Sequence, residues 1–104
     1  MTTTSPQIAE KLYEEGTKRG FHVLDAPVTG GDTGAREGTL SILVGGDKSD
    51  YTNCHELFEA MGTNINYEGS AGCGQHCKLA NQIMIAGALS GVCEALTYAK
   101  EKGL

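Results

Sequence analysis

Tryptophan is absent from this chain of 104 residues, proline occurs only twice, and basic residues are few. Eight Lys and Arg residues stand against thirteen Asp and Glu residues, which leaves a net charge of −5. Nucleic acid is therefore not expected as a partner, because phosphate binding needs clustered basic side chains. The chain also lacks the unbroken apolar run of about 20 residues that is typical of a membrane span, so no membrane partner is expected.

The N-terminal residues MTTTSP lack the basic and apolar regions of a secretory signal. Cysteines occur only at positions 54, 73, 77 and 93. We expect them to be free thiols in a reducing compartment, and hence expect a cytoplasmic protein.

Glycine is the abundant residue, at 15 of 104 positions. This is about twice its average share of roughly 7%. The glycines gather at 30–31, 45–46 and 72–74, where they indicate turns and close backbone approaches.

Hydrophobic periodicity and turn residues predict an α/β fold with about three strands in one small domain. In chain order, the expected elements are a helix from Pro6 to Gly20, a strand over 21–28, an irregular glycine-rich segment over 29–39, a strand over 40–46, a helix over 49–61, a strand over 64–69 and a helix over 73–102. The last helix is apolar nearly all round, so it needs partners on several sides. We therefore expect a homo-oligomer that forms through this C-terminal helix, or a further domain that covers it.

The stretch GCGQHCKLANQ, residues 72–82, carries three alternative chemistries. G72-C-G74-Q-H-C77 approaches the dinucleotide fingerprint G-x-G-x-x-G, but the required second strand does not follow the helix. Cys73, His76 and Cys77 share a helix face and, with Cys54 or His55, form a candidate zinc site. No C-x-x-C pair supports that site, and buried free cysteines explain the pattern equally well.

The third alternative is a polar site around Lys78, with Asn81 and Gln82 on the same helix face at i+3 and i+4. A single helical lysine is usually a solvated surface residue. Here, however, no other charge occurs between Ala71 and Gly91, which is unusual for a solvated face. The segment Thr29-Gly30-Gly31 follows a strand end and offers backbone N–H groups for an anion.

Two motifs resemble those of one known family. D25-A-P-V-T-G-G31, followed by G34-A-x-x-G-T-L40 and V44-G-G46, resembles the substrate-binding stretch of the β-hydroxyacid dehydrogenases. G72-C-G-Q-H-C-K78-L-A-N81-Q82 resembles the catalytic segment of the same family. That family includes 3-hydroxyisobutyrate dehydrogenase and tartronate semialdehyde reductase, and it is related to 6-phosphogluconate dehydrogenase.

The resemblance implies a role for each matched residue. Lys78 matches the catalytic lysine, which exchanges a proton with the carbonyl or hydroxyl oxygen of the substrate. Substrate binding is implied for Thr29, Gly30, Gly31, Asn81 and Gln82, with Thr29 in place of the usual Ser. Thr3 matches a threonine near the nicotinamide of NAD or NADP.

The resemblance also implies a domain organisation. Residues 1–70 correspond to the C-terminal part of a Rossmann-like NAD-binding domain, and 71–104 to a long interdomain helix that opens an all-α domain. The family's dinucleotide-binding glycine loop is not in this sequence, so we expect poor cofactor binding and little or no activity from the chain alone. The alternatives are a non-catalytic oligomerising remnant and a zinc-binding module.

Overall fold

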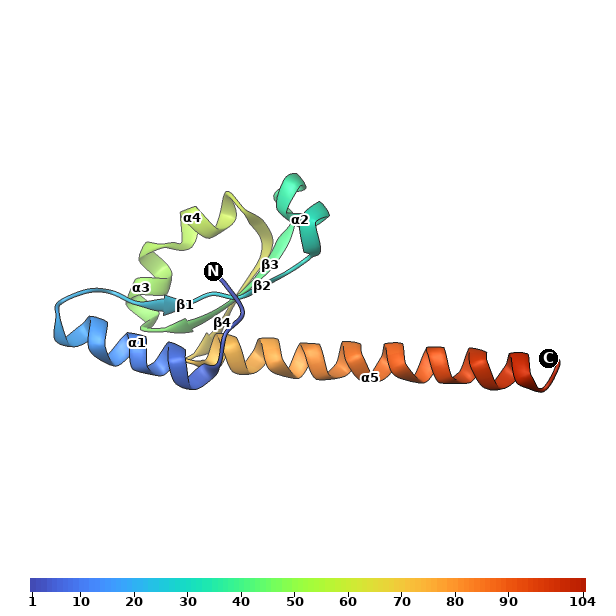
Figure 1. Ribbon diagram of the computed structural model, residues 1–104. Helices are drawn as coiled ribbons and strands as arrows, with labels where there is room; N and C mark the ends of the chain where they lie inside the picture. Colours follow the sequence, from blue (N-terminus) through green and yellow to red (C-terminus); the bar gives the residue numbers. More distant parts are fainter.

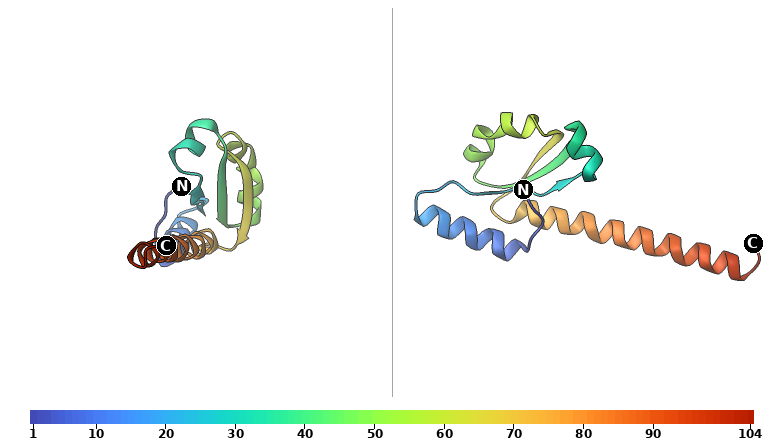
Figure 2. Two further views of the ribbon diagram at one scale, coloured as in Figure 1. Left: turned by 90° about the vertical axis from the view of Figure 1, so that its right-hand side faces the viewer. Right: turned by 45° about the horizontal axis from the view of Figure 1, so that its top comes forward.

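The computed structural model describes all residues, 1–104. Its elements are α1 (Pro6–Lys18), β1 (Leu24–Asp25), β2 (Val28–Thr29), α2 (Gly31–Glu37), β3 (Leu40–Gly46), α3 (Lys48–Asn53), α4 (His55–Glu59), β4 (Gly62–Gly69) and α5 (Cys73–Glu101). They form three layers, with α1 and the start of α5 on one side of the sheet and α3 and α4 on the other (Figures 1 and 2). The α/β class and the long C-terminal helix are confirmed.

Strand β3 is the centre of the sheet. Both β1 and β2 pair with it in antiparallel fashion, with Leu24 opposite Gly46 and Val28 opposite Ile42. On its other side, β4 runs parallel to β3. Because β3 is covered on both faces, it reads as the continuous apolar run LSILVGG, in which every residue except the second is buried.

The hydrophobic core lies between the sheet and the α3–α4 side. Its buried members are Ala26, Leu40, Ile42, Val44 and Phe58. Ile42 and Val44 have no exposed surface, so their burial holds β3 in the core. This small core leaves much of the chain outside it.

Two of the expected elements are divided in the structure. The strand predicted over 21–28 is interrupted at Ala26-Pro27, so that β1 and β2 flank the break and the sheet has four strands rather than three. The buried Pro27 still contributes, because its carbonyl accepts a hydrogen bond from the N–H of Leu43 at 3.0 Å. The helix predicted over 49–61 breaks at Cys54, where the backbone turns to φ −94° and ψ 0°.

The prediction of an irregular segment over 29–39 is wrong in part, because α2 lies within it. Glycine hides this helix from sequence periodicity. Gly38 ends α2 in the left-handed conformation, and its N–H returns to the carbonyl of Gly34. An exposed ion pair between Asp32 and Arg36, at 3.1 Å, joins successive turns.

Helix α5 extends far beyond the sheet (Figure 1). The radius of gyration is 17.5 Å, whereas a compact chain of this length has about 13 Å. Only Gly74, Gln75 and Lys78 of α5 are buried. The exposed large apolar residues of α5 are Leu79, Ile83, Met84, Ile85, Leu89, Val92, Leu96 and Tyr98.

By length and composition alone, α5 is also long and apolar enough to cross a membrane, with a mean hydropathy of 1.3 over 18 residues. The expectation drawn from unbroken apolar runs did not register this, because glycine, serine and polar residues interrupt those runs while alanine keeps the average high. A core helix of a soluble protein passes the same test, but such a helix is mostly buried, whereas this window of α5 is 0% buried.

Candidate functional site

The site begins with a carboxylate that caps α5 from a distant strand. Asp25, in β1, accepts hydrogen bonds from the backbone N–H of Gly72 at 2.8 Å and of Gln75 at 2.9 Å. These N–H groups have no partner within the helix, and a negative charge at this end is favourable. Asp25 therefore joins β1, which precedes β2 and Thr29 in the chain, with the helix that carries Lys78.

Glycines allow this approach of helix and sheet. A Cβ at Gly74 would lie 2.4 Å from the carbonyl oxygen of Leu43, and one at Gly45 would lie 2.8 Å from the backbone nitrogen of Gly74. Gly72 has φ +88°, which favours glycine. The G-x-G spacing therefore serves close packing. The dinucleotide-fingerprint alternative is not supported, because Asp25 already occupies N–H groups that a phosphate would need.

Lys78 lies in the second turn of α5 and is 8% exposed. Lysine is almost never this buried unless it is paired. None of the four ion pairs of the chain involves Lys78. The only fully buried side-chain polar atom without a partner is Nδ1 of His55, so the Lys78 ammonium keeps access to solvent while its stem is covered. The ammonium is thus free to meet an external ligand.

Asn81 and Gln82 follow on the next turn. Asn81 is half-buried and Gln82 is exposed. The amide of Asn81 donates from Nδ2 to Oε1 of Gln82 at 3.4 Å. Asn81 is therefore the better placed of the two to share a ligand with Lys78, which lies three residues before it.

Thr3 is attached to the start of α5 through its two neighbours. Gln75, only 2% exposed, accepts at Oε1 a hydrogen bond from the N–H of Thr4 at 3.0 Å. Its Nε2 donates to the carbonyl of Thr2 at 2.7 Å. The structure thereby brings the Thr3 segment within one helical turn of Lys78 along α5.

Thr29, Gly30 and Gly31 connect β2 to α2. Thr29 is half-buried opposite Ser41 of β3, and both glycines are exposed with positive φ, +132° at Gly30 and +64° at Gly31. No side chain caps the N-terminus of α2. No hydrogen bond joins residues 29–31 to α5. Their position relative to Lys78 is therefore set indirectly, through β2, β1 and the hydrogen bonds of Asp25 to α5.

The thiol of Cys77, beside Lys78 in the sequence, is held in its neutral form. Burial raises the pKa of Cys77, and the Glu68 carboxylate of β4 raises it further by its charge and by a hydrogen bond. A thiolate is the form that attacks electrophiles and binds metals. Cys77 is therefore poorly suited to either task.

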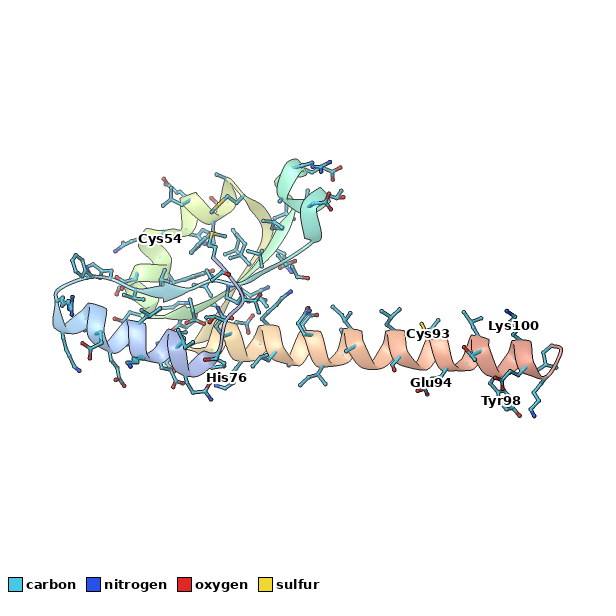
Figure 3. The ribbon with its side chains drawn as sticks, in the orientation of Figure 1. Cys54, His76, Cys93, Glu94, Tyr98 and Lys100 are labelled. Atoms are coloured by element: carbon cyan, nitrogen blue, oxygen red, sulfur yellow. The ribbon has the colours of Figure 1, made fainter.

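The zinc-site alternative is not supported by the side-chain geometry. No three His, Cys, Asp or Glu side chains lie close enough to share a metal ion. Figure 3 shows Cys54 on the α3–α4 side of the sheet and His76 on α5 at the opposite side. The cysteines are free thiols.

These features define a partial α/β domain that carries a polar site on its long helix. Residues 1–69 match the family described as the NAD binding domain of 6-phosphogluconate dehydrogenase. The chain belongs to this family.

Curated relatives resemble the chain along its whole length. An uncharacterized oxidoreductase, YkwC, of Bacillus subtilis is 50% identical over 104 residues, which are 100% of this chain and 36% of the relative. The 2-hydroxy-3-oxopropionate reductase of Escherichia coli is 46% identical over 103 residues, 99% of this chain and 35% of the relative. The chain thus spans about a third of the length of the curated relatives it matches.

Solved structures agree with the fold. The 3-hydroxyisobutyrate dehydrogenase of Mycobacterium tuberculosis, determined with L-serine, superposes with a TM-score of 0.93 at 35% identity. The match covers 98% of this chain and 35% of that one. The expected partial Rossmann-like domain is confirmed.

The sequence-based assignment of site residues overlooked Asp25 and Gln75. Asp25 opens the motif DAPVTGG, but nothing in its local pattern shows that its partner lies about fifty residues away. Gln75 looks like an ordinary polar residue in the first turn of a helix. The available signal is the start of α5 itself. A helix that begins with glycines and has no capping side chain of its own needs a cap from elsewhere in the chain.

Proposed function

We propose that this chain is the central part of an NAD(P)-dependent oxidoreductase that interconverts a small 3-hydroxy acid and its semialdehyde or 3-oxo acid. The observation that carries this proposal is the buried, unpaired Lys78 on a helix that Asp25 ties to β1, from which the chain runs through β2 to Thr29-Gly30-Gly31. The family membership and the names of the relatives support the same reaction class.

In the proposed reaction Lys78 handles the proton. During reduction its ammonium donates a proton to the carbonyl oxygen, and during oxidation its amine takes the proton back from the hydroxyl. Reduced nicotinamide, when bound, supplies the hydride to the carbonyl carbon. Asn81 holds the reacting oxygen by a hydrogen bond. Gln82, which is exposed, contributes to substrate binding at the edge of the site.

The substrate carboxylate is assigned to Thr29, Gly30 and Gly31. No side chain caps the turn at Gly30, and the backbone N–H groups of such a turn favour an anion. The Thr29 hydroxyl adds a further donor. A short hydroxy acid would then lie with its carboxylate at α2 and its hydroxyl at Lys78.

The residues present fit only the nicotinamide end of the cofactor. Thr3 is exposed and held near the start of α5, whereas the N–H groups of Gly72 and Gln75 are taken by Asp25 and are not free for a pyrophosphate. We therefore assign Thr3 to the nicotinamide and propose residues 1–70 as the NAD-binding part and 71–104 as the interdomain helix. Weak cofactor binding and little or no turnover follow for the chain alone.

Ligand titration by NMR tests this function. Addition of 3-hydroxyisobutyrate with NADPH should perturb the amides of Gly30 and Gly31 together with the side chain of Lys78. Lys78→Met removes the ammonium at similar size and should abolish the response, while Lys11→Met on the exposed face of α1 should preserve it. A response confined to other residues, or none, contradicts the proposal. Rapid oxidation of NADPH by the chain in the presence of the corresponding semialdehyde, which is the form that accepts the hydride, contradicts the expectation of low activity.

The second candidate is a non-catalytic oligomerising remnant. The exposed apolar surface of α5 favours it, because a row of large apolar residues from Leu79 to Leu96 stays in solvent without a partner. We propose a homo-oligomer formed through α5 in either case. Absence of any NADPH response in a chain that still self-associates would select the remnant.

The free thiols support a cytoplasmic location.

A further inference from the structure

Gln75 uses both polar atoms of its side chain on the same short segment. Oε1 accepts from the N–H of Thr4 at 3.0 Å, and Nε2 donates to the carbonyl of Thr2 at 2.7 Å. The partners lie 71 and 73 residues away in the chain. A side-chain amide carries the same donor and acceptor as a peptide group. Gln75 therefore pairs with residues 2–4 as a neighbouring strand would.

The pattern of these two hydrogen bonds determines which groups of Thr3 stay unpaired. A parallel strand pair bonds to the carbonyl before, and to the N–H after, the residue it faces. Gln75 does the same around Thr3. The N–H and carbonyl of Thr3 itself are left out of this pairing, and Thr3 is exposed. We call these two hydrogen bonds from the Gln75 side chain to Thr2 and Thr4 the clamp. The clamp fixes the backbone on both sides of Thr3 and leaves Thr3 free for a ligand.

The other end of Gln75 is fixed as well. Its backbone N–H is held by Oδ2 of Asp25 at 2.9 Å, and its side chain is 2% exposed. Lys78 lies three residues later, on the same buried face of α5. Gln75 is therefore the direct link between the Thr3 segment and the helix turn that carries Lys78.

We propose that Gln75 is a positioning residue, which sets Thr3 against Lys78 so that both face one bound ligand. This role rests on the proposed function, in which Thr3 lies at the nicotinamide and Lys78 at the reacting oxygen. Only glutamine suits the task among close analogues. Glutamate has no donor for Thr2, methionine has neither group, and asparagine is shorter by one carbon–carbon bond of about 1.5 Å.

Amide hydrogen exchange in the 104-residue chain tests the clamp. In Gln75→Met the Thr4 amide should exchange at least tenfold faster, while the amides of β3 and the middle of α5 keep their rates. Gln7→Met, an exposed glutamine of α1, should leave Thr4 unchanged. Equal acceleration at all amides would reduce Gln75 to a purely structural residue, and an unchanged Thr4 rate would exclude the clamp. Gln75→Asn, which keeps a polar group in the core, takes the place of Gln75→Met if that variant does not fold.

A titration with NADPH tests what the clamp positions. In the natural chain the signals of the Thr3 methyl and of Lys78 should shift together, with one dissociation constant. In Gln75→Met the Lys78 response should weaken at least fivefold and the Thr3 response should vanish. A Thr3 response identical to that of the natural chain would overturn the proposal. If the natural chain does not respond to NADPH, the proposed function fails, but Thr4 exchange still decides the role of Gln75.

Discussion

The carboxylate of Asp25 accepts a hydrogen bond from the backbone N–H of Gln75 at 2.9 Å, across 50 positions of the sequence. Asp25 ends β1, from which the chain runs through β2 to Thr29, and Gln75 belongs to the helix that carries Lys78. The bond therefore sets the register between the two halves of the proposed site. It also occupies the helix end that a phosphate would otherwise take.

Asp25→Asn should destabilise the fold by about 2 kcal/mol. The neutral amide can still accept one of the two hydrogen bonds, but its NH₂ group then faces an N–H donor that is left unpaired. Urea unfolding measures the change. Asp32→Asn is the control, because its partner Arg36 is exposed and such pairs contribute only about 0.5 kcal/mol. Equal stability of the two variants would show that Asp25 does not cap α5.

Gly74→Ala should destabilise the chain by about 1–3 kcal/mol, the usual range for overpacking. The new Cβ would lie 2.4 Å from the carbonyl oxygen of Leu43, so helix and sheet would have to separate. Gly87→Ala in the same helix meets nothing within 4 Å and should stabilise by about 0.5–1 kcal/mol. Thermal unfolding of the pair checks the opposite signs, and a stabilising Gly74→Ala would contradict the close approach.

Cys77 should react with iodoacetamide more slowly than the exposed Cys93 at neutral pH. Burial and then Glu68 raise the pKa of Cys77, so its reactive thiolate forms only at higher pH. Glu68→Gln should lower that pKa and speed the reaction, yet leave Cys77 slower than Cys93 because burial is the larger cause. Mass spectrometry of the alkylated chain gives both rates.

The same shift has a consequence for stability. The folded chain holds the Cys77 proton more tightly than the unfolded chain. The resulting contribution to the stability of the fold is complete below the ordinary thiol pKa. It is lost as the pH rises through the raised pKa of the folded state. Cys77→Ser should reduce the fall in stability at alkaline pH, and an unchanged alkaline slope would speak against the shift.

Self-association through α5 should weaken at least tenfold in Leu89→Glu, because a carboxylate would have to be buried against the partner helix. Leu57→Glu provides the matched control, since Leu57 of α4 is 66% exposed and Leu89 is 62% exposed. Sedimentation equilibrium of the two variants and the natural chain measures the dissociation constants. A natural chain that stays monomeric at high concentration would exclude the oligomer.

Regular elements were predictable where the pattern was local. The run LSILVGG and the apolar repeat after Cys73 identify β3 and α5 without any other information. Helix α2 was not predictable, because glycine at its start, middle and end conceals the period. The break at Cys54 likewise depends on tertiary packing, since Phe58 enters the core while Asp50 pairs with His22 at 2.8 Å.

By itself, the sequence determined the α/β class, the long helix and the residues that resemble a substrate site, because periodicity and motif spacing are properties of neighbouring positions. Only the tertiary structure showed that Lys78 is buried without an ion pair, and that Asp25 and Gln75 hold the surrounding segments. Burial and pairing join segments that lie far apart in the chain: the partners of Asp25 and Gln75 are about fifty and seventy residues away, and no local pattern specifies them.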